Sequence, residues 1–162
     1  VIAERFSKIG SKPEMELIYV NEVLENATEY MRRRVSDKVL ITTHLPSDAE
    51  GAMVCLSLFE WVIENLCKNA VDAMNGEGRI DVYMTSEKQQ IYIDIKDTGK
   101  GIARKNFKTV FNPGYTTKKR GWGLGLTLAK RIIEDYHAGR IYVKDSEVGK
   151  GTIFRIELKR VV

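Results

Sequence analysis

Apolar residues recur at every fourth position in the middle of this chain. This spacing predicts a long helix from about residue 52 to residue 74, because residues four apart lie on one face of a helix. The apolar stripe of this helix consists of Leu58, Val62, Leu66 and Ala70. The segment 75–78, Asn-Gly-Glu-Gly, follows, and we expect it to end the helix with a glycine in the left-handed conformation.

Alternation of apolar and polar residues predicts two strands after the central helix. Residues 80–85 and 91–96 form a hairpin with one apolar and one polar face, so the sheet has one covered face. Further strands are predicted at residues 16–20, 39–43, 140–145 and 152–158. Further helices are predicted at residues 21–35, with Asn21 as N-cap, and at residues 124–137, ended by Gly139.

This order of elements predicts an α/β fold of the α+β type. We expect a two-layer α/β sandwich, with helices on one face of a mixed, mostly antiparallel sheet. The length of 162 residues favours one domain. Residues 1–10 read as the end of a preceding helix, broken by Gly10 to Pro13, so the domain itself is expected to span residues 13–162 after a separate segment 1–12.

Composition and charge narrow the class of protein. No apolar run approaches the roughly 20 residues that span a bilayer, and Glu4, Arg5 and Lys8 interrupt the first segment, so no signal peptide is expected. The net charge of +4 suits a phosphorylated ligand and is too small to indicate nucleic acid. Cys55 and Cys67 would lie about 18 Å apart on one helix, too far for a disulfide, so we expect reduced core thiols.

Two asparagines and three glycine-rich turns carry the candidate chemistry. Asn65 and Asn69 share one face of the central helix, and an amide oxygen can ligate Mg²⁺ without adding negative charge beside phosphates. The pair taken alone also fits solvated or capping asparagines. The turns are 97-DTGKG-101, 121-GWGLGL-126 and 149-GKGTIF-154.

The first two glycine turns point to a nucleotide. Asp97 stands at a strand end and can accept a hydrogen bond from the exocyclic amine of adenine, whereas guanine presents a carbonyl there; the alternative is an ordinary turn aspartate. The second turn opens a helix, where backbone N–H groups can approach a polyphosphate. Thr127 could add a hydroxyl. The spacing fits neither a dinucleotide-binding fingerprint nor a Walker A loop.

Together the asparagine helix and the glycine turns resemble the N box and glycine boxes of the histidine-kinase catalytic, ATP-binding domain, over roughly residues 50–158. That family belongs to the gyrase, heat-shock-chaperone, histidine-kinase and mismatch-repair ATPase superfamily. The resemblance implies the Bergerat-type fold, ATP and Mg²⁺ as ligands, and protein-histidine kinase activity in two-component signalling. It also implies that Asp97 binds adenine, that Thr152 helps to hold Asp97 and a water, and that Asn69 ligates Mg²⁺ with Asn65 beside the phosphates.

The loop 111-FNPGYTTKKR-120 resembles the F box and ATP lid of the same family. A lid with cationic side chains could neutralise the γ-phosphate; the alternative is a solvated basic loop. Tyr115 either packs on the nucleotide or anchors the lid. The full set of expected ATP-binding residues is Asn65, Asn69, Ala73, Asp97, Gly99, Gly101, Ile102, Tyr115, Thr116, Thr117, Lys118, Lys119, Arg120, Gly121, Gly123, Leu124, Gly125, Leu126, Thr127 and Thr152.

The sequence departs from the family at two positions of the central helix. The superfamily's hydrolases carry a water-activating glutamate four residues before the metal asparagine, and here that residue is Asn65, which favours transfer over hydrolysis. Glu64 lies about 100° further round the helix and either touches the metal shell or is structural. Asp72 replaces the basic residue that often contacts phosphate. Glu64, Lys118 and Arg120 remain the candidates for catalytic support.

The phosphate-accepting histidine of the family is missing from this chain. His44 lacks an obvious partner and is expected at the surface, and neither it nor His137 precedes an acidic residue. The resemblance therefore implies that residues 1–12 end a helical-hairpin dimerisation domain that carries the acceptor. It also implies a downstream response regulator, a homodimeric full-length protein and a cytoplasmic location for this domain; a membrane anchor, if the whole protein has one, lies outside this sequence.

Three alternatives share the fold. The first is an ATP-gated conformational ATPase like the chaperone or gyrase, and the second is a serine-kinase anti-sigma factor; both tend to keep the glutamate that Asn65 replaces. The third is a non-catalytic module that binds a nucleotide or a protein partner. Rapid ATP hydrolysis by this chain alone would favour the first.

Overall fold

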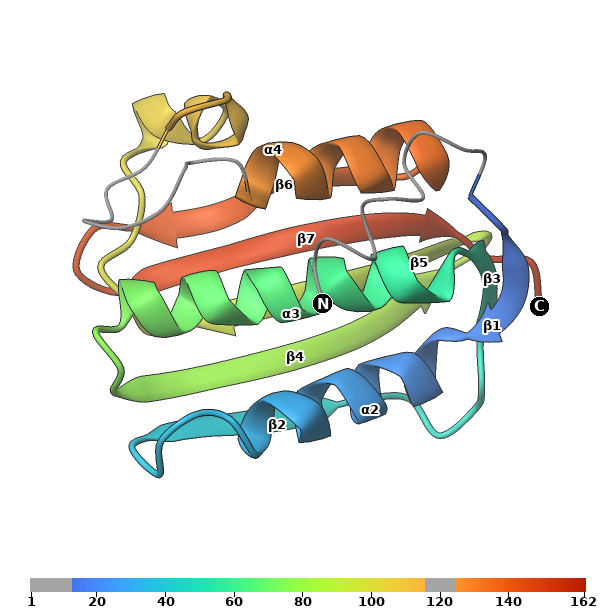
Figure 1. Cartoon of the computed structure of the whole chain (residues 1–162), viewed down its shortest axis with the longest axis horizontal. Helices are drawn as coiled ribbons and strands as arrows, with labels where there is room; N and C mark the ends of the chain where they lie inside the picture. The colour runs from blue at the N-terminus through green and yellow to red at the C-terminus, as the bar shows by residue number, and fades with distance from the viewer. Residues whose placement is uncertain (1–12, 116–124) are drawn as a thin grey trace.

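A computed structural model describes residues 13–115 and 125–162, and its main feature is a five-stranded sheet (Figure 1). The spatial order of the strands is β2-β4-β5-β7-β6. The strands are β2 (Val39–His44), β4 (Gly78–Glu87), β5 (Gln90–Asp97), β6 (Arg140–Glu147) and β7 (Gly151–Lys159). Only the β2–β4 pairing is parallel, so the sheet is mixed and mostly antiparallel, as predicted.

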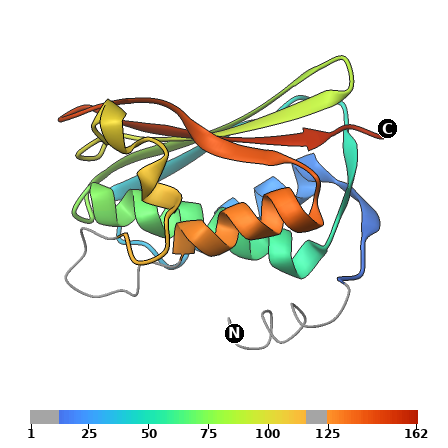
Figure 2. The ribbon, with the colours of Figure 1, turned by 90° about the horizontal axis from the view of Figure 1, so that it is seen from above.

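The helices cover one face of this sheet and leave the other face open (Figure 2). They are α2 (Val20–Arg32), α3 (Leu56–Ala73) and α4 (Gly125–Arg131), which continues as a π turn over Ile132–Tyr136. Short 3₁₀ turns at Arg104–Asn106 and Thr109–Phe111 precede α4. The predicted two-layer α/β sandwich is confirmed. Within the described residues, no helix combines the length and the apolar character needed to cross a membrane.

The core lies between α3 and the sheet, and the predicted stripe forms its centre. The four residues of the stripe are all buried in α3. On the sheet, Ile80 and Val82 of β4 and Ile93 and Ile95 of β5 are buried beneath them. The alternation of apolar and polar residues therefore identified the covered face correctly, because side chains of a strand point to opposite faces in turn.

The predicted start of the central helix is wrong. Residues Gly51–Val54 form a strand, β3, which pairs with β1 (Glu16–Tyr19) in a second, two-stranded sheet, and α3 begins only at Leu56. The backbone of Gly51 also exchanges hydrogen bonds with Val161 and Val162 near the other end of the sequence. These long-range bonds satisfy the backbone of residues 51–54 in an extended form, and a local apolar pattern cannot reveal them.

The predicted helix ends also need correction. Asn21 lies inside α2 rather than capping it, and its side-chain amide instead bonds the backbone of Pro46, Asp48 and Glu50. After α3, both Asn75 and Gly76 are left-handed, with φ of 55° and 78°, so the expected left-handed glycine is present. After α4, the left-handed residue is Ala138, with φ of 51°, instead of Gly139. The glycine after Ala138 serves close packing instead, because a Cβ on it would lie 2.3 Å from the carbonyl oxygen of Glu157.

His44 has a partner, contrary to the prediction. Its Nε2 lies 2.8 Å from Oδ1 of Asp81, and its ring stacks on Tyr83 with the centroids 4.4 Å apart. Parallel pairing sets His44 opposite Tyr83, so the contact follows from the β2–β4 register. Burial alone would raise the pKa of Asp81, but hydrogen bonds from Arg79 and His44 outweigh burial and lower it.

The two cysteines are free and buried, as expected, although Cys55 precedes α3 instead of lying within it. The N–H of Cys55 donates to Nε2 of His137 at 3.0 Å, and Nδ1 of the same ring lies 2.9 Å from the carbonyl oxygen of Ile132. Since Nε2 accepts, the ring is neutral and its proton sits on Nδ1. His137 thus joins the end of the α4 segment to the start of α3.

Replacing His137 with phenylalanine is expected to destabilise the fold by about 1–3 kcal/mol, because it leaves the buried N–H of Cys55 without its acceptor. Burial lowers the pKa of His137 from 6.5. Below about pH 6.5 the unfolded chain therefore binds more protons at this residue, and its contribution to stability falls as the pH drops. Urea denaturation at pH 7.5 and pH 5 gives the free energy of unfolding at each pH. This free energy should fall less between the two pH values in the variant than in the wild type.

His44→Gln is the control for this experiment, because His44 is partly exposed and its contacts are with Asp81 and Tyr83 of β4. In His44→Gln, the part of the pH dependence of the unfolding free energy that comes from His137 should remain. An unchanged pH dependence in His137→Phe would contradict the assignment of a neutral, proton-excluding ring.

Candidate functional site

Asp97 ends strand β5 and is the buried carboxylate around which the site is arranged. It is 4% exposed, and its Oδ1 accepts the N–H of Gly99 at 2.8 Å and the N–H of Thr152 at 3.3 Å. Burial raises the pKa of Asp97 and outweighs these two N–H bonds, which lower it. Both bonds fall on one oxygen, so the carboxylate is oriented with Oδ2 turned away from these two N–H groups.

Backbone segments approach one another around Asp97 more closely than any side chain would permit. A Cβ on Gly99 would lie 2.7 Å from the carbonyl oxygen of Ala73 at the end of α3. A Cβ on Gly151 would lie 2.0 Å from the carbonyl oxygen of Asp97. The N–H of Lys100 also donates to Ala73, at 2.9 Å. The first glycine turn therefore closes directly on the end of α3, and the third glycine turn closes on the first.

The β6–β7 hairpin supplies a residue that sequence reasoning did not single out. Ser146 accepts the N–H of Ile102 at 2.7 Å, donates to the carbonyl oxygen of Gly151 at 2.9 Å and lies 2.8 Å from the hydroxyl of Thr152. The only signal in the sequence is its position six residues before Thr152 across a glycine turn, which sets the two opposite each other in a hairpin. Thr152 holds Asp97 through its backbone N–H, while its hydroxyl contacts Ser146.

The asparagine face of α3 meets the start of α4. A Cβ on Gly125 would lie 2.8 Å from Oδ1 and 3.0 Å from Nδ2 of Asn65, so the amide lies directly against this glycine. The Nδ2 of Asn65 is buried and has no hydrogen-bond partner among the described residues. Asn69 follows one turn later and is half-buried, whereas Glu64 is 8% exposed. A buried amide donor without an acceptor is suited to an anion.

Thr127 makes a contact within the protein that the sequence did not predict. Its hydroxyl donates to the carbonyl oxygen of Phe111 at 2.8 Å and so ties α4 to the end of the second 3₁₀ turn. Ile102, Tyr115 and Leu126 are partly buried and pack against the core. The remaining expected residues of the lid and second glycine turn, Thr116, Thr117, Lys118, Lys119, Arg120, Gly121, Gly123 and Leu124, lie outside the described residues.

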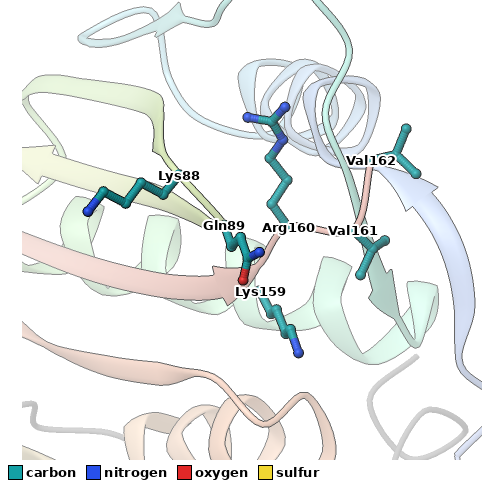
Figure 3. Close-up of a pocket in the computed structure, with 6 residues that line it drawn as sticks. All are labelled: Lys88, Gln89, Lys159, Arg160, Val161 and Val162. Atoms are coloured by element: carbon teal, nitrogen blue, oxygen red, sulfur yellow. The ribbon is translucent and has the colours of Figure 1, made fainter.

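A hollow of about 530 Å³ lies at the opposite end of β5 from Asp97 (Figure 3). Its lining residues are Lys88, Gln89, Lys159, Arg160, Val161 and Val162. The long side chains of the two lysines and the arginine point away from one another, so they do not converge on a common ligand (Figure 3). The nucleotide site is therefore assigned to the Asp97 end of β5.

Asp97, the close glycine turns and the asparagine helix define a nucleotide-binding α/β sandwich. The model of the Histidine kinase-, DNA gyrase B-, and HSP90-like ATPase family matches residues 56–162, and the chain belongs to this family. The predicted ATP-binding fold of a histidine-kinase catalytic domain is thereby confirmed. Family membership does not test the roles of individual residues.

Known relatives and solved structures agree with this assignment. The chain is 40% identical over 99 residues to sporulation kinase A of Bacillus subtilis, covering 61% of this chain and 16% of that protein. It is 43% identical over 98 residues to the sensor histidine kinase ZraS of Salmonella typhimurium, covering 60% and 21%. The catalytic domain of the histidine kinase ThkA has the same fold, with a TM-score of 0.80, 22% identity and coverage of 90% and 95%.

Proposed function

We propose that this domain binds Mg²⁺·ATP and donates the γ-phosphoryl group to a histidine on a separate domain. The chain covers less than a quarter of sporulation kinase A and of ZraS, so this activity is a proposal for the whole protein. The observation that carries the proposal is the buried carboxylate of Asp97, fixed by two backbone N–H groups where the first glycine turn meets α3 and the third meets the first. Relatives named as sporulation and sensor kinases support the direction of transfer.

Each part of the site has a role in this proposal. Asp97 accepts the exocyclic amine of adenine, and Gly99 and Gly101 leave room for the base. The buried Nδ2 of Asn65 donates to a phosphate oxygen, which supplies the acceptor that it lacks among the described residues. Gly125, the first residue of α4, lies against the amide of Asn65, and this contact supports a place for the start of α4 beside the same phosphates.

The donor set on α3 fits Mg²⁺, because amide and carboxylate oxygens are its usual protein ligands. Asn69 would hold the ion, with Glu64 in the surrounding shell or in a structural role. When bound, Mg²⁺ neutralises charge on the β- and γ-phosphates. The residues of this chain then position the γ-phosphoryl group, while the lid cations Lys118, Lys119 and Arg120 offset its remaining charge.

Asn65 favours transfer over hydrolysis. The position four residues before Asn69 holds an amide, which cannot act as a general base toward water, whereas a glutamate there could. The acceptor is therefore proposed to be an imidazole nitrogen on a separate helical-hairpin domain. In the transfer, the P–O bond to ADP breaks and a P–N bond to the imidazole forms.

The partners proposed for the whole protein follow from this chemistry and from its relatives. A solved complex joins the histidine kinase ThkA to the response regulator TrrA, at 21% identity to this chain and a TM-score of 0.79. We accordingly propose a response regulator as the downstream acceptor, a homodimer held by the helical-hairpin domain, and a cytoplasmic position for residues 13–162.

The test is a transfer assay with the purified hairpin domain of the same protein, Mg²⁺ and ATP labelled on the γ-phosphate. We expect label on histidine, which is recognised by its lability in acid and its stability in base. Binding of ATP without transfer would reject the kinase and leave the non-catalytic module. Rapid hydrolysis by residues 1–162 alone would instead support an ATP-gated machine.

A further inference from the structure

Ser146 makes three contacts that determine where its own proton lies. Its Oγ accepts the N–H of Ile102 at 2.7 Å and donates to the carbonyl oxygen of Gly151 at 2.9 Å. The third contact, at 2.8 Å, is with the hydroxyl of Thr152. A serine hydroxyl has one proton and two acceptor lone pairs. Since the proton goes to Gly151, the hydroxyl of Thr152 must donate to Ser146.

This arrangement leaves the Thr152 hydroxyl with only lone pairs to offer. Its single proton is used by Ser146, so toward any other group it can only accept. Thr152 is 4% exposed, and its own N–H reaches the carboxylate of Asp97. Thr152 therefore donates its N–H to the carboxylate of Asp97 and carries, on the same residue, a hydroxyl that can only accept.

We propose that Ser146 is a positioning residue that determines nucleotide specificity by fixing the Thr152 hydroxyl as an acceptor. The inference rests on the proposed function, in which the adenine amine lies at Asp97. The amine of adenine can donate to the carboxylate of Asp97 and, directly or through a water, to the hydroxyl of Thr152. A purine with a carbonyl at the same ring position would set lone pairs against lone pairs, and the Ser146 contact prevents Thr152 from turning its proton outward to relieve this.

The test compares the affinities for Mg²⁺·ATP and for Mg²⁺·inosine triphosphate. In the second purine a carbonyl replaces the 6-amine, and the neighbouring ring nitrogen N1, an acceptor in adenine, carries a proton. Ser146→Ala frees the Thr152 proton to donate to the carbonyl. We expect the preference for ATP to fall by about tenfold, the value of one neutral hydrogen bond. Thr152→Val should also lower the preference, and adding Ser146→Ala to it should cause no further change, because Ser146 acts through that hydroxyl.

Ser146→Thr and Ser86→Ala are the controls. Ser146→Thr retains a hydroxyl and should retain the preference. Ser86 is also a strand serine with a side-chain partner, Glu50, so Ser86→Ala removes a comparable hydroxyl without touching Asp97 or Thr152. Ser86→Ala should leave the ratio of the two affinities unchanged, whatever its effect on the melting temperature.

The outcomes separate this inference from the proposed function. A wild-type preference for ATP that persists in Ser146→Ala, or that falls equally in Ser86→Ala, overturns the role of Ser146 and leaves the adenine site intact. Failure of the wild-type protein to bind either nucleotide overturns the proposed function itself.

Discussion

Asp97→Asn is expected to lower the affinity for ATP by about ten- to a hundredfold while leaving the unliganded protein at least as stable as the wild type. A hydrogen bond to a charged group contributes about 1.5–3 kcal/mol, and an amide that turns its NH₂ toward the adenine amine cannot replace it. The variant keeps an oxygen for the N–H groups of Gly99 and Thr152, so the local backbone retains its partners.

The effect on stability follows from the direction of the pKa shift. Burial raises the pKa of Asp97 above 3.8, so the folded state binds more protons at this residue than the unfolded state. The contribution of Asp97 to stability is therefore favourable at low pH and is lost as the pH rises through its folded pKa. At neutral pH the buried charge destabilises the unliganded fold, and replacing it with a neutral amide removes that cost. The difference between variant and wild type should shrink as the pH falls toward 4.

Thermal melts with and without Mg²⁺·ATP provide the measurement. A ligand at 100 times its Kd stabilises by about 2.7 kcal/mol, or about 5–10 °C for a chain of this size. The wild type should shift with ATP and not with GTP, and Asp97→Asn should lose the shift. Asp94→Asn is the matched control: it lies on the same strand, but it pairs with Arg155 on the open face of the sheet.

Asp94→Asn should keep the full ATP shift and lower the melting temperature of the unliganded protein, because it breaks a two-bond contact with Arg155 at 2.7 and 2.8 Å. Asp97→Asn is therefore expected to lose ATP binding and keep its stability, whereas Asp94→Asn is expected to lose stability and keep ATP binding. If ATP raises the melting temperature of Asp97→Asn as much as that of the wild type, Asp97 does not bind adenine.

The elements that the sequence predicted well are those whose periodicity matches one buried face. The hairpin of β4 and β5 and the stripe of α3 follow directly from apolar spacing, because burial on one side dictates a period of two or of about four. The start of α3 did not follow, since Gly51 is held extended by Val161 and Val162. Helix termini were similarly misplaced where a side chain, such as that of Asn21, bonds a distant loop.

The candidate site shows the same division. Asp97 could be identified because its carboxylate, its strand end and its glycines are adjacent in sequence. Ser146 and His137 could not, since their partners lie across a hairpin or on another helix: His137 meets Cys55, 82 residues away. Hydroxyl and imidazole groups acquire their roles from register and packing, and neither leaves a periodic signal. The roles assigned to the asparagines and lid residues remain predictions.

Gly101→Ala is expected to cost about 3 kcal/mol or more of folding stability. Gly101 has φ of +79°, and a Cβ there would lie 2.2 Å from the carbonyl oxygen of Glu147 in the β6–β7 hairpin. The variant therefore combines a left-handed backbone, which costs an L-residue about 1–2 kcal/mol, with a backbone clash that only displacement of the hairpin can relieve. Because Ile102 bonds Ser146 in the same hairpin, the displacement should also weaken ATP binding.

Gly76→Ala separates these two contributions. Gly76 has nearly the same φ, +78°, but a Cβ on it would meet nothing within 4 Å. Its substitution should cost only the backbone strain, about 1–2 kcal/mol, and should leave ATP affinity unchanged. Urea denaturation of both variants gives the comparison. If both variants lose the same free energy of unfolding, the first glycine turn can move away from the β6–β7 hairpin without cost. The close contact between the turn and the hairpin would then not determine the shape of the adenine pocket.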